Sequence, residues 1–183
     1  MEGSVLVVFA TRYGSTREIA EAVGAGLRES GIEAEVGRLR EAPLPEAYRG
    51  VVIGAPLQMF KWHKDALHYI ADNRQSLSRK PVAVFAVGPV TAEEREWEEA
   101  RTQLDKGLAR FPWFLPFEKR IFGGKFDPGD LRFPWTLMPG VKRWPPSDAR
   151  EPKAVSAWVA QLAARFGAGE GQPDEMSSAP EAE

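Results

Sequence analysis

The chain has 183 residues, of which 43% are hydrophobic and 27% charged. This composition is ordinary for a soluble globular domain and argues against a disordered chain or a coiled coil. The net charge of −2 argues against a strongly basic nucleic-acid binder. The absence of cysteine excludes disulfides, zinc fingers and iron–sulfur clusters. No apolar run is long enough to span a bilayer and the start does not resemble a secretory signal, so we expect a cytoplasmic protein.

Short apolar runs alternate with amphipathic segments along most of the chain. β-branched and apolar residues predict strands, several of them buried on both faces, over 5–10, 33–39, 50–55, 81–87 and 119–124. Helical spacing predicts a first helix with Ser15 and Glu18 as a capping box and Gly31 at its end. Further helices are predicted over 64–77, over 92–110, and from a cap at Asp148 to residue 166.

Strands that alternate with helices in this way form βαβ units. The fold class is therefore α/β, with a doubly wound, five-stranded parallel sheet and helices on both faces. Ligands of such folds bind beyond the carboxyl ends of the strands, which places the candidate site in loops 10–16, 55–62 and 87–92. We expect one domain over 1–166, followed by an acidic, disordered tail over 167–183 that is rich in Gly, Pro, Ser and Glu.

The loop after the first strand has the composition of a phosphate site. It contains three hydroxyl side chains and a glycine, and it leads directly into a helix whose N-terminal N–H groups and dipole favour an anion. The alternative is an ordinary strand-to-helix turn with a Ser cap.

Competing nucleotide and cation motifs are missing. The first loop contains neither G-x-G-x-x-G nor G-x-x-x-x-G-K-[ST], which argues against a dinucleotide Rossmann site and a P-loop NTPase. A receiver domain would place acidic residues at the ends of the first and third strands, where this chain has Phe9-Ala10-Thr11 and Gly54-Ala55-Pro56, so no metal site is expected there.

The segment VLVVFATRYGSTREIAEAVGAGL resembles the start of the flavodoxin superfamily, with its T-x-T-G-x-T phosphate loop. The pattern V-x-F-A-T-R-x-G-x-T-R-E-I-A, followed by VVIGAPLQMFKWHKDAL and IFGGKF, is similar to the flavodoxin-like, menaquinone-dependent protoporphyrinogen oxidase family over about residues 4–166. The resemblance implies strand order 2-1-3-4-5, FMN as cofactor, and a quinone as electron partner.

The resemblance also implies a set of flavin-binding residues. The phosphate loop would comprise Thr11, Arg12, Tyr13, Gly14, Ser15 and Thr16. One side of the isoalloxazine ring would be met by Pro56, Leu57 and Gln58, for which the alternative is a simple strand-exit turn, and the other side by Gly88, Pro89 and Val90.

Two departures bear on the substrate. The family's long segment after the fifth strand is shortened here to 125–150, which weakens the case for docking on a quinone-bearing membrane, and Glu93, Glu94 and Glu96 would repel an anionic porphyrinogen. Lys61, His63 and Lys64 would counter that repulsion.

Several alternatives stay open. His63 is a weak acid–base candidate, and the alternative is a capping or surface histidine. The aromatic stretches 111–117 and 133–146 have two interpretations: they line a quinone or porphyrin site, or they cover the hydrophobic core, which is the interpretation we favour. We expect the protein to be a quinone-linked protoporphyrinogen dehydrogenase. Its small-molecule substrate would be a porphyrinogen, and it would contact the membrane peripherally. The alternatives are an electron carrier that docks a redox protein and a binding module that has lost FMN.

Overall fold

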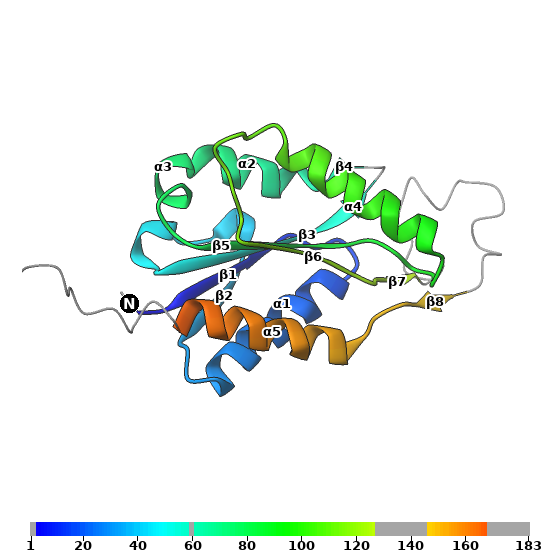
Figure 1. Ribbon diagram of the computed structural model, residues 1–183, viewed down its shortest axis with the longest axis horizontal. Helices are drawn as coiled ribbons and strands as arrows, with labels where there is room; N and C mark the ends of the chain where they lie inside the picture. Colours follow the sequence, from blue (N-terminus) through cyan, green and yellow to red (C-terminus); the bar gives the residue numbers. More distant parts are fainter. Residues whose placement is uncertain (1–2, 59–60, 127–145, 168–183) are drawn as a thin grey trace, which may run out of the picture.

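The computed structural model describes residues 3–58, 61–126 and 146–167, and these form a three-layer sandwich with a sheet between two layers of helices (Figure 1). In chain order the longer elements are β1 (Val5–Phe9), α1 (Ser15–Glu29), β2 (Ala34–Arg38), β3 (Gly50–Gln58), α2 (Lys64–Asp72), α3 (Arg74–Leu77), β5 (Val82–Val87), α4 (Glu94–Leu108), β6 (Glu118–Phe122) and α5 (Pro152–Gly167). Short strands are β4 (Lys61–Trp62), β7 (Lys125–Phe126) and β8 (Ser147–Asp148), and 3-10 turns are η1 (Leu39–Glu41) and η2 (Pro45–Ala47).

The main sheet is parallel, in the order β2-β1-β3-β5-β6. Because β4 is a short antiparallel strand that branches off β3, this order is the predicted 2-1-3-4-5 arrangement of the five longer strands. The predicted fold class is confirmed, and the α/β alternation explains it: each crossover helix returns the chain to the same edge of the sheet.

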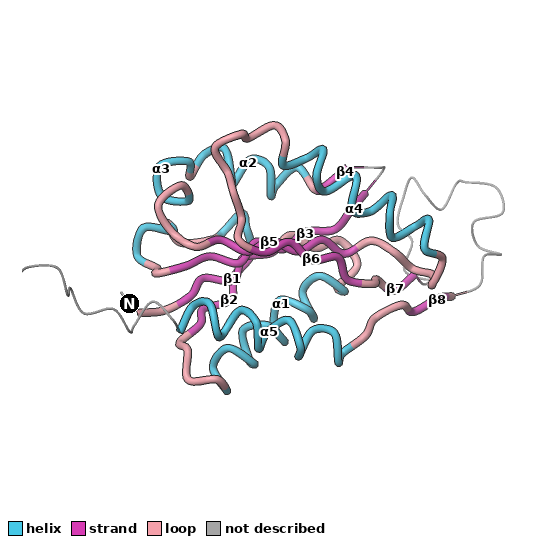
Figure 2. Tube along the Cα trace, viewed as in Figure 1, coloured by secondary structure: helices cyan, strands magenta, loops and turns pink. Residues whose placement is uncertain are grey.

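Helices cover both faces of the sheet, as Figure 2 shows, with α1 and α5 on one side and α2, α3 and α4 on the other. All five residues of β1 and all six of β5 are buried, which explains why these strands are apolar on both faces. Trp158 of α5 is fully buried and packs edge-on against Phe85 and Phe122, so α5 is fixed to the sheet by aromatic contacts.

Three predicted details of the helices are wrong. The capping box does not form, because Gly14 is the N-cap of α1 and the Glu18 side chain contacts Arg150 instead. The helix expected over 64–77 is interrupted at Asn73, whose side chain donates to the Tyr69 carbonyl (2.9 Å) and ends α2. Asp148 lies in β8 and binds Arg150, so α5 begins only at Pro152.

Two hairpin-like features were not predicted. β3 runs three residues further than expected, to Gln58, and folds back onto β4, where the buried Trp62 indole donates to the Ala55 carbonyl (3.1 Å). β7 and β8 pair as a two-stranded antiparallel ribbon that follows β6.

The structure bears on only part of the predictions for the aromatic stretches and the tail. Within 111–117, Phe114 is buried and Phe111, Trp113 and Phe117 pack on the core, as expected, whereas Leu115 is exposed. Residues 133–145, and the predicted tail from residue 168 onward, lie outside the described residues. None of the described helices combines the length and hydrophobicity that a bilayer-spanning helix needs.

Candidate cofactor site

The carboxyl ends of β1, β3 and β5 lie at one edge of the sheet, so the three loops singled out from the sequence come together there (Figure 1). The phosphate-loop candidates Thr11–Thr16 connect β1 to α1, Pro56, Leu57 and Gln58 end β3, and Gly88, Pro89 and Val90 follow β5. The ribbon β7–β8 emerges at the same edge.

The first turn of α1 presents unpaired backbone donors. Its first helical hydrogen bond runs from Glu18 N–H to the Gly14 carbonyl (3.1 Å), so the N–H groups of Ser15, Thr16 and Arg17 precede the helical ladder. Gly14 has a φ of +100°, a conformation that L side chains rarely adopt, and it lets the chain turn directly into the helix. This arrangement suits a phosphate group.

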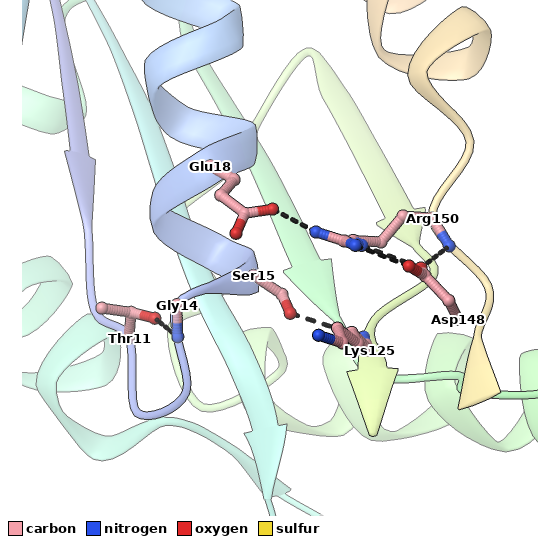
Figure 3. Close-up of polar contacts among 7 residues, drawn as sticks. All are labelled: Thr11, Gly14, Ser15, Glu18, Lys125, Asp148 and Arg150. Carbon is pink, nitrogen blue, oxygen red and sulfur yellow. Dashed lines mark hydrogen bonds and ion pairs between the residues drawn. The ribbon is translucent and has the colours of Figure 1, made fainter. Parts of the chain in front are cut away.

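Two hydroxyl groups of this loop already accept a backbone hydrogen bond. Gly14 N–H donates to Thr11 Oγ1 (3.0 Å), and Lys125 N–H donates to Ser15 Oγ (3.4 Å), as Figure 3 shows. A hydroxyl that accepts in this way keeps its own proton for donation, so Thr11 and Ser15 are prepared as donors to an anion. Thr16 is almost fully buried at the start of the helix.

The exposed tip of the loop carries a cation. The Arg12 guanidinium lies 5.5 Å from the centre of the Tyr13 ring, and Tyr13 is 41% exposed. Together these side chains form an aromatic and positively charged surface beside the helix end.

The second predicted segment is a strand, not the strand-exit turn that was the alternative. Pro56 is in register with Val87 of β5, Leu57 pairs with Trp62, and the Pro56 carbonyl accepts from His63 N–H (3.1 Å). Pro56, Leu57 and Gln58 are partly exposed, so they present surface at the carboxyl edge.

The third predicted segment is fixed by an acid. The Glu96 carboxylate accepts from Val90 N–H (2.9 Å), Thr91 N–H (3.1 Å) and the Thr91 hydroxyl (2.5 Å). On its other side, Pro89 accepts from Gly124 N–H (2.7 Å). The loop is therefore held in one conformation by α4 and by the chain after β6.

Two of the three acids expected to repel an anionic substrate are engaged. Glu96 binds the loop backbone, and Glu94 pairs with Arg101 (2.5 Å), while Glu93 is the N-cap residue of α4. Only Glu94 is paired with a cation, because the partners of Glu96 are uncharged, so the pairing reduces the predicted repulsion at one of the three acids.

His63 is the N-cap of α2. Its Nδ1 accepts from Asp65 N–H (3.2 Å), which requires an unprotonated ring nitrogen. Burial lowers the pKa of His63, and Arg40, Lys64 and Arg12 lower it further, against a raising effect of Asp65. The capping interpretation is correct in the structure, and these cations make the surroundings of His63 positive. Lys61 and Lys64 are both exposed.

A family model described as a flavodoxin domain matches residues 6–138. The chain belongs to the flavodoxin domain family. Among curated proteins, protoporphyrinogen IX dehydrogenase [quinone] of Escherichia coli K12 is 32% identical over 111 residues. That alignment covers 59% of this chain and 61% of the relative, so this chain matches about three fifths of the relative's length.

Solved structures agree on the fold. A flavodoxin from the domain Archaea superposes with a TM-score of 0.58 at 13% identity, covering 90% of this chain and 99% of that one. Rubredoxin oxygen:oxidoreductase of Desulfovibrio gigas superposes with a TM-score of 0.59 at 13% identity, covering 93% of this chain and 37% of that one. Flavodoxin 2 of Bacillus cereus gives 0.54 at 21% identity, covering 91% and 99%.

Membership of the flavodoxin domain family indicates FMN as the cofactor. The residues present fit that cofactor, because the phosphate end of FMN needs donors without a metal ion, and the start of α1 offers both open N–H groups and prepared hydroxyls.

Sequence reasoning missed three residues that shape this edge. Glu96 holds the loop after β5, Lys125 donates to Ser15, and Arg150 contacts Glu18. Only Glu96 had a local signal, since an acid three residues after an N-cap is typical of a side chain that turns back to the preceding backbone. The other two contacts join segments more than 100 residues apart.

Proposed function

We propose that this protein is an FMN-dependent oxidoreductase that transfers electrons from a porphyrinogen to a quinone. The observation that carries the proposal is the 32% identity over 111 residues to a quinone-linked protoporphyrinogen IX dehydrogenase. The prepared donors of the phosphate loop support it, because they give a flavin a place to bind at the carboxyl edge.

Each segment of the site has its own role in this proposal. Thr11–Thr16 bind the FMN phosphate through hydroxyl and backbone donors. Pro56, Leu57 and Gln58 face one side of the isoalloxazine ring, and Gly88, Pro89 and Val90 face the other. Bound FMN supplies the electron-transfer chemistry, and the protein orients the ring and sets its electrostatic surroundings.

No side chain is needed as a general base. His63 uses Nδ1 to cap α2, and this contact makes it a structural residue in the proposal. The cations Arg12, Lys61 and Lys64 near this edge attract an anionic substrate, since long-range charge raises the rate of encounter.

A direct assay separates this proposal from the electron-carrier alternative. The full chain is reconstituted with FMN and mixed with protoporphyrinogen under anaerobic conditions with a menaquinone analogue as acceptor. Porphyrin formation that depends on both FMN and the quinone supports the dehydrogenase. A carrier would form no porphyrin at any ionic strength, but would be reduced rapidly by a flavodoxin reductase.

A further inference from the structure

The ribbon β7–β8 and the residues that follow β8 are tied to the first turn of α1 by two contacts. Lys125 N–H donates to Ser15 Oγ (3.4 Å), and the Arg150 guanidinium contacts the Glu18 carboxylate, as Figure 3 shows. Ser15 and Glu18 are three residues apart and lie on the same side of the helix. Both contacts therefore hold the ribbon against the part of α1 that carries the phosphate-loop candidates.

Asp148 fixes the orientation of Arg150. Its carboxylate accepts from Arg150 Nε (2.8 Å) and Nη2 (2.5 Å), a two-point pairing, and also from the Arg150 backbone N–H (3.1 Å). These hydrogen bonds from Arg150 lower the pKa of Asp148 to about 2, so Asp148 is ionised at neutral pH. With Nε and Nη2 occupied, Nη1 is left to reach Glu18.

The residues directly before β7 and after β8 are also packed closely together. A Cβ atom on Gly123 would lie 1.8 Å from the Ala149 carbonyl oxygen, and Ala149 N–H donates to the Gly124 carbonyl (3.0 Å). Lys125 and Asp148 are direct partners in the β7–β8 ladder. The position of Lys125 N–H over Ser15 consequently depends on where Asp148 and Arg150 are held.

We propose that Arg150 is a positioning residue for the phosphate of FMN. Through its ion pair with Glu18, Arg150 holds the ribbon against α1 and maintains the hydrogen bond from Lys125 N–H to Ser15 Oγ. The Ser15 hydroxyl proton is then directed to the phosphate, because its oxygen already serves as an acceptor. This inference rests on the FMN site of the proposed function and adds to it a residue 135 positions from Ser15 in the sequence.

The test compares FMN with riboflavin, which lacks the phosphate. Apoprotein of Arg150→Gln is titrated with each flavin by fluorescence quenching. FMN affinity should fall about three- to tenfold, the range expected for loss of an oriented polar contact at a half-exposed site, while riboflavin affinity stays unchanged. Equal weakening for both flavins would show a merely structural role and overturn the proposal, as would no change for either.

Two further variants distinguish positioning from simple charge. Glu18→Ala should weaken FMN binding as Arg150→Gln does, because it removes the acceptor of the same contact. If Arg150 acted only by its charge, removing the negative charge of Glu18 would tighten FMN binding instead. In a Ser15→Ala background, Arg150→Gln should have almost no further effect, whereas fully additive losses would contradict an action through Ser15.

The matched control is Arg95→Gln on α4, which breaks an exposed pair with Glu99 (2.9 Å) that includes neither α1 nor the ribbon, and it should leave both flavin affinities unchanged. Failure of the underlying FMN site has a different signature. If the unaltered protein binds FMN and riboflavin equally well, the phosphate-loop assignment is wrong. If it prefers FMN but Arg150→Gln retains the full preference, only the role of Arg150 is wrong.

Discussion

Leu57 at the end of β3 lies directly against Gly88 at the end of β5, so close that a Cβ atom on Gly88 would be 2.9 Å from Leu57 Cδ1 and 3.1 Å from Leu57 Cβ. The two segments proposed to face opposite sides of the isoalloxazine ring are therefore in contact with each other. A side chain at position 88 would displace Leu57, and with it the surface offered to the ring.

Gly88→Ala should consequently weaken FMN and riboflavin by the same factor, because the isoalloxazine ring is common to both. The measurement is a pair of fluorescence titrations on the apoprotein. Gly37→Ala is the matched control, since nothing lies within 4 Å of a Cβ atom there, and it should change neither affinity. A loss confined to FMN would place Gly88 near the phosphate and contradict the assignment.

Thr16→Ala, in contrast, should affect FMN binding more than riboflavin binding. Removing one hydroxyl donor to a charged group should cost about 1.5–3 kcal/mol of FMN binding free energy and little of riboflavin binding. Thr102→Ala, an exposed position on α4, serves as the control and should bind both flavins as the unaltered protein does. Equal affinity of the unaltered protein for the two flavins would refute the phosphate loop itself.

The capping role of His63 predicts a pH dependence of stability. The pKa of His63 is lowered in the folded protein from its usual 6.5, mainly by burial, so between the two values the unfolded chain binds more protons. The contribution of neutral His63 to the free energy of unfolding is therefore complete above pH 6.5 and is lost as the pH falls toward the pKa of His63 in the folded protein.

Chemical unfolding of the protein and of His63→Asn checks this. Asn keeps a side-chain acceptor at the N-cap but does not titrate, so it should flatten the decline in unfolding free energy between about pH 7 and about pH 5. An unchanged slope would mean that another group titrates there.

Charge reversal at Lys61 and Lys64 tests whether these side chains attract the anionic substrate. Their double exchange to Glu reverses the charge of two exposed side chains beside His63, which should raise KM for protoporphyrinogen, most at low ionic strength, and leave FMN content unchanged. Arg79→Glu combined with Arg165→Glu makes the same charge change at two exposed positions beside the starts of the strands, at the opposite edge of the sheet, and should leave KM unaltered. An increase in KM of equal size in both double variants would show an effect of net charge alone.

The strands were predictable because they carry strong local signals, whereas their order was implied by the resemblance to the flavodoxin superfamily. Val5–Phe9 and Val82–Val87 are buried on both faces, and the pattern of their residues shows it. The length of β3 was not predictable, since Pro56 and Leu57 look like the end of a strand and are held in it by Val87 and Trp62. Tertiary contacts decided that boundary.

Some residues of the candidate site could likewise be predicted from the local sequence, and others could not. The hydroxyls and Gly14 of the first loop could be recognised because they are adjacent in the sequence. Lys125 and Arg150 could not, because nothing local connects them to Ser15 or Glu18. Asp148 was misplaced as a helix cap for the same reason: an Asp before a helix suits a cap, and only the structure shows that it orients Arg150.

The most direct test of the central claim is the reoxidation of the reduced, FMN-loaded protein by a menaquinone analogue, followed anaerobically by stopped-flow absorbance. If the protein is a quinone-linked FMN oxidoreductase, the oxidised flavin spectrum returns at a rate that increases with quinone concentration. Reoxidation no faster than in buffer without quinone, at every quinone concentration, would contradict that claim.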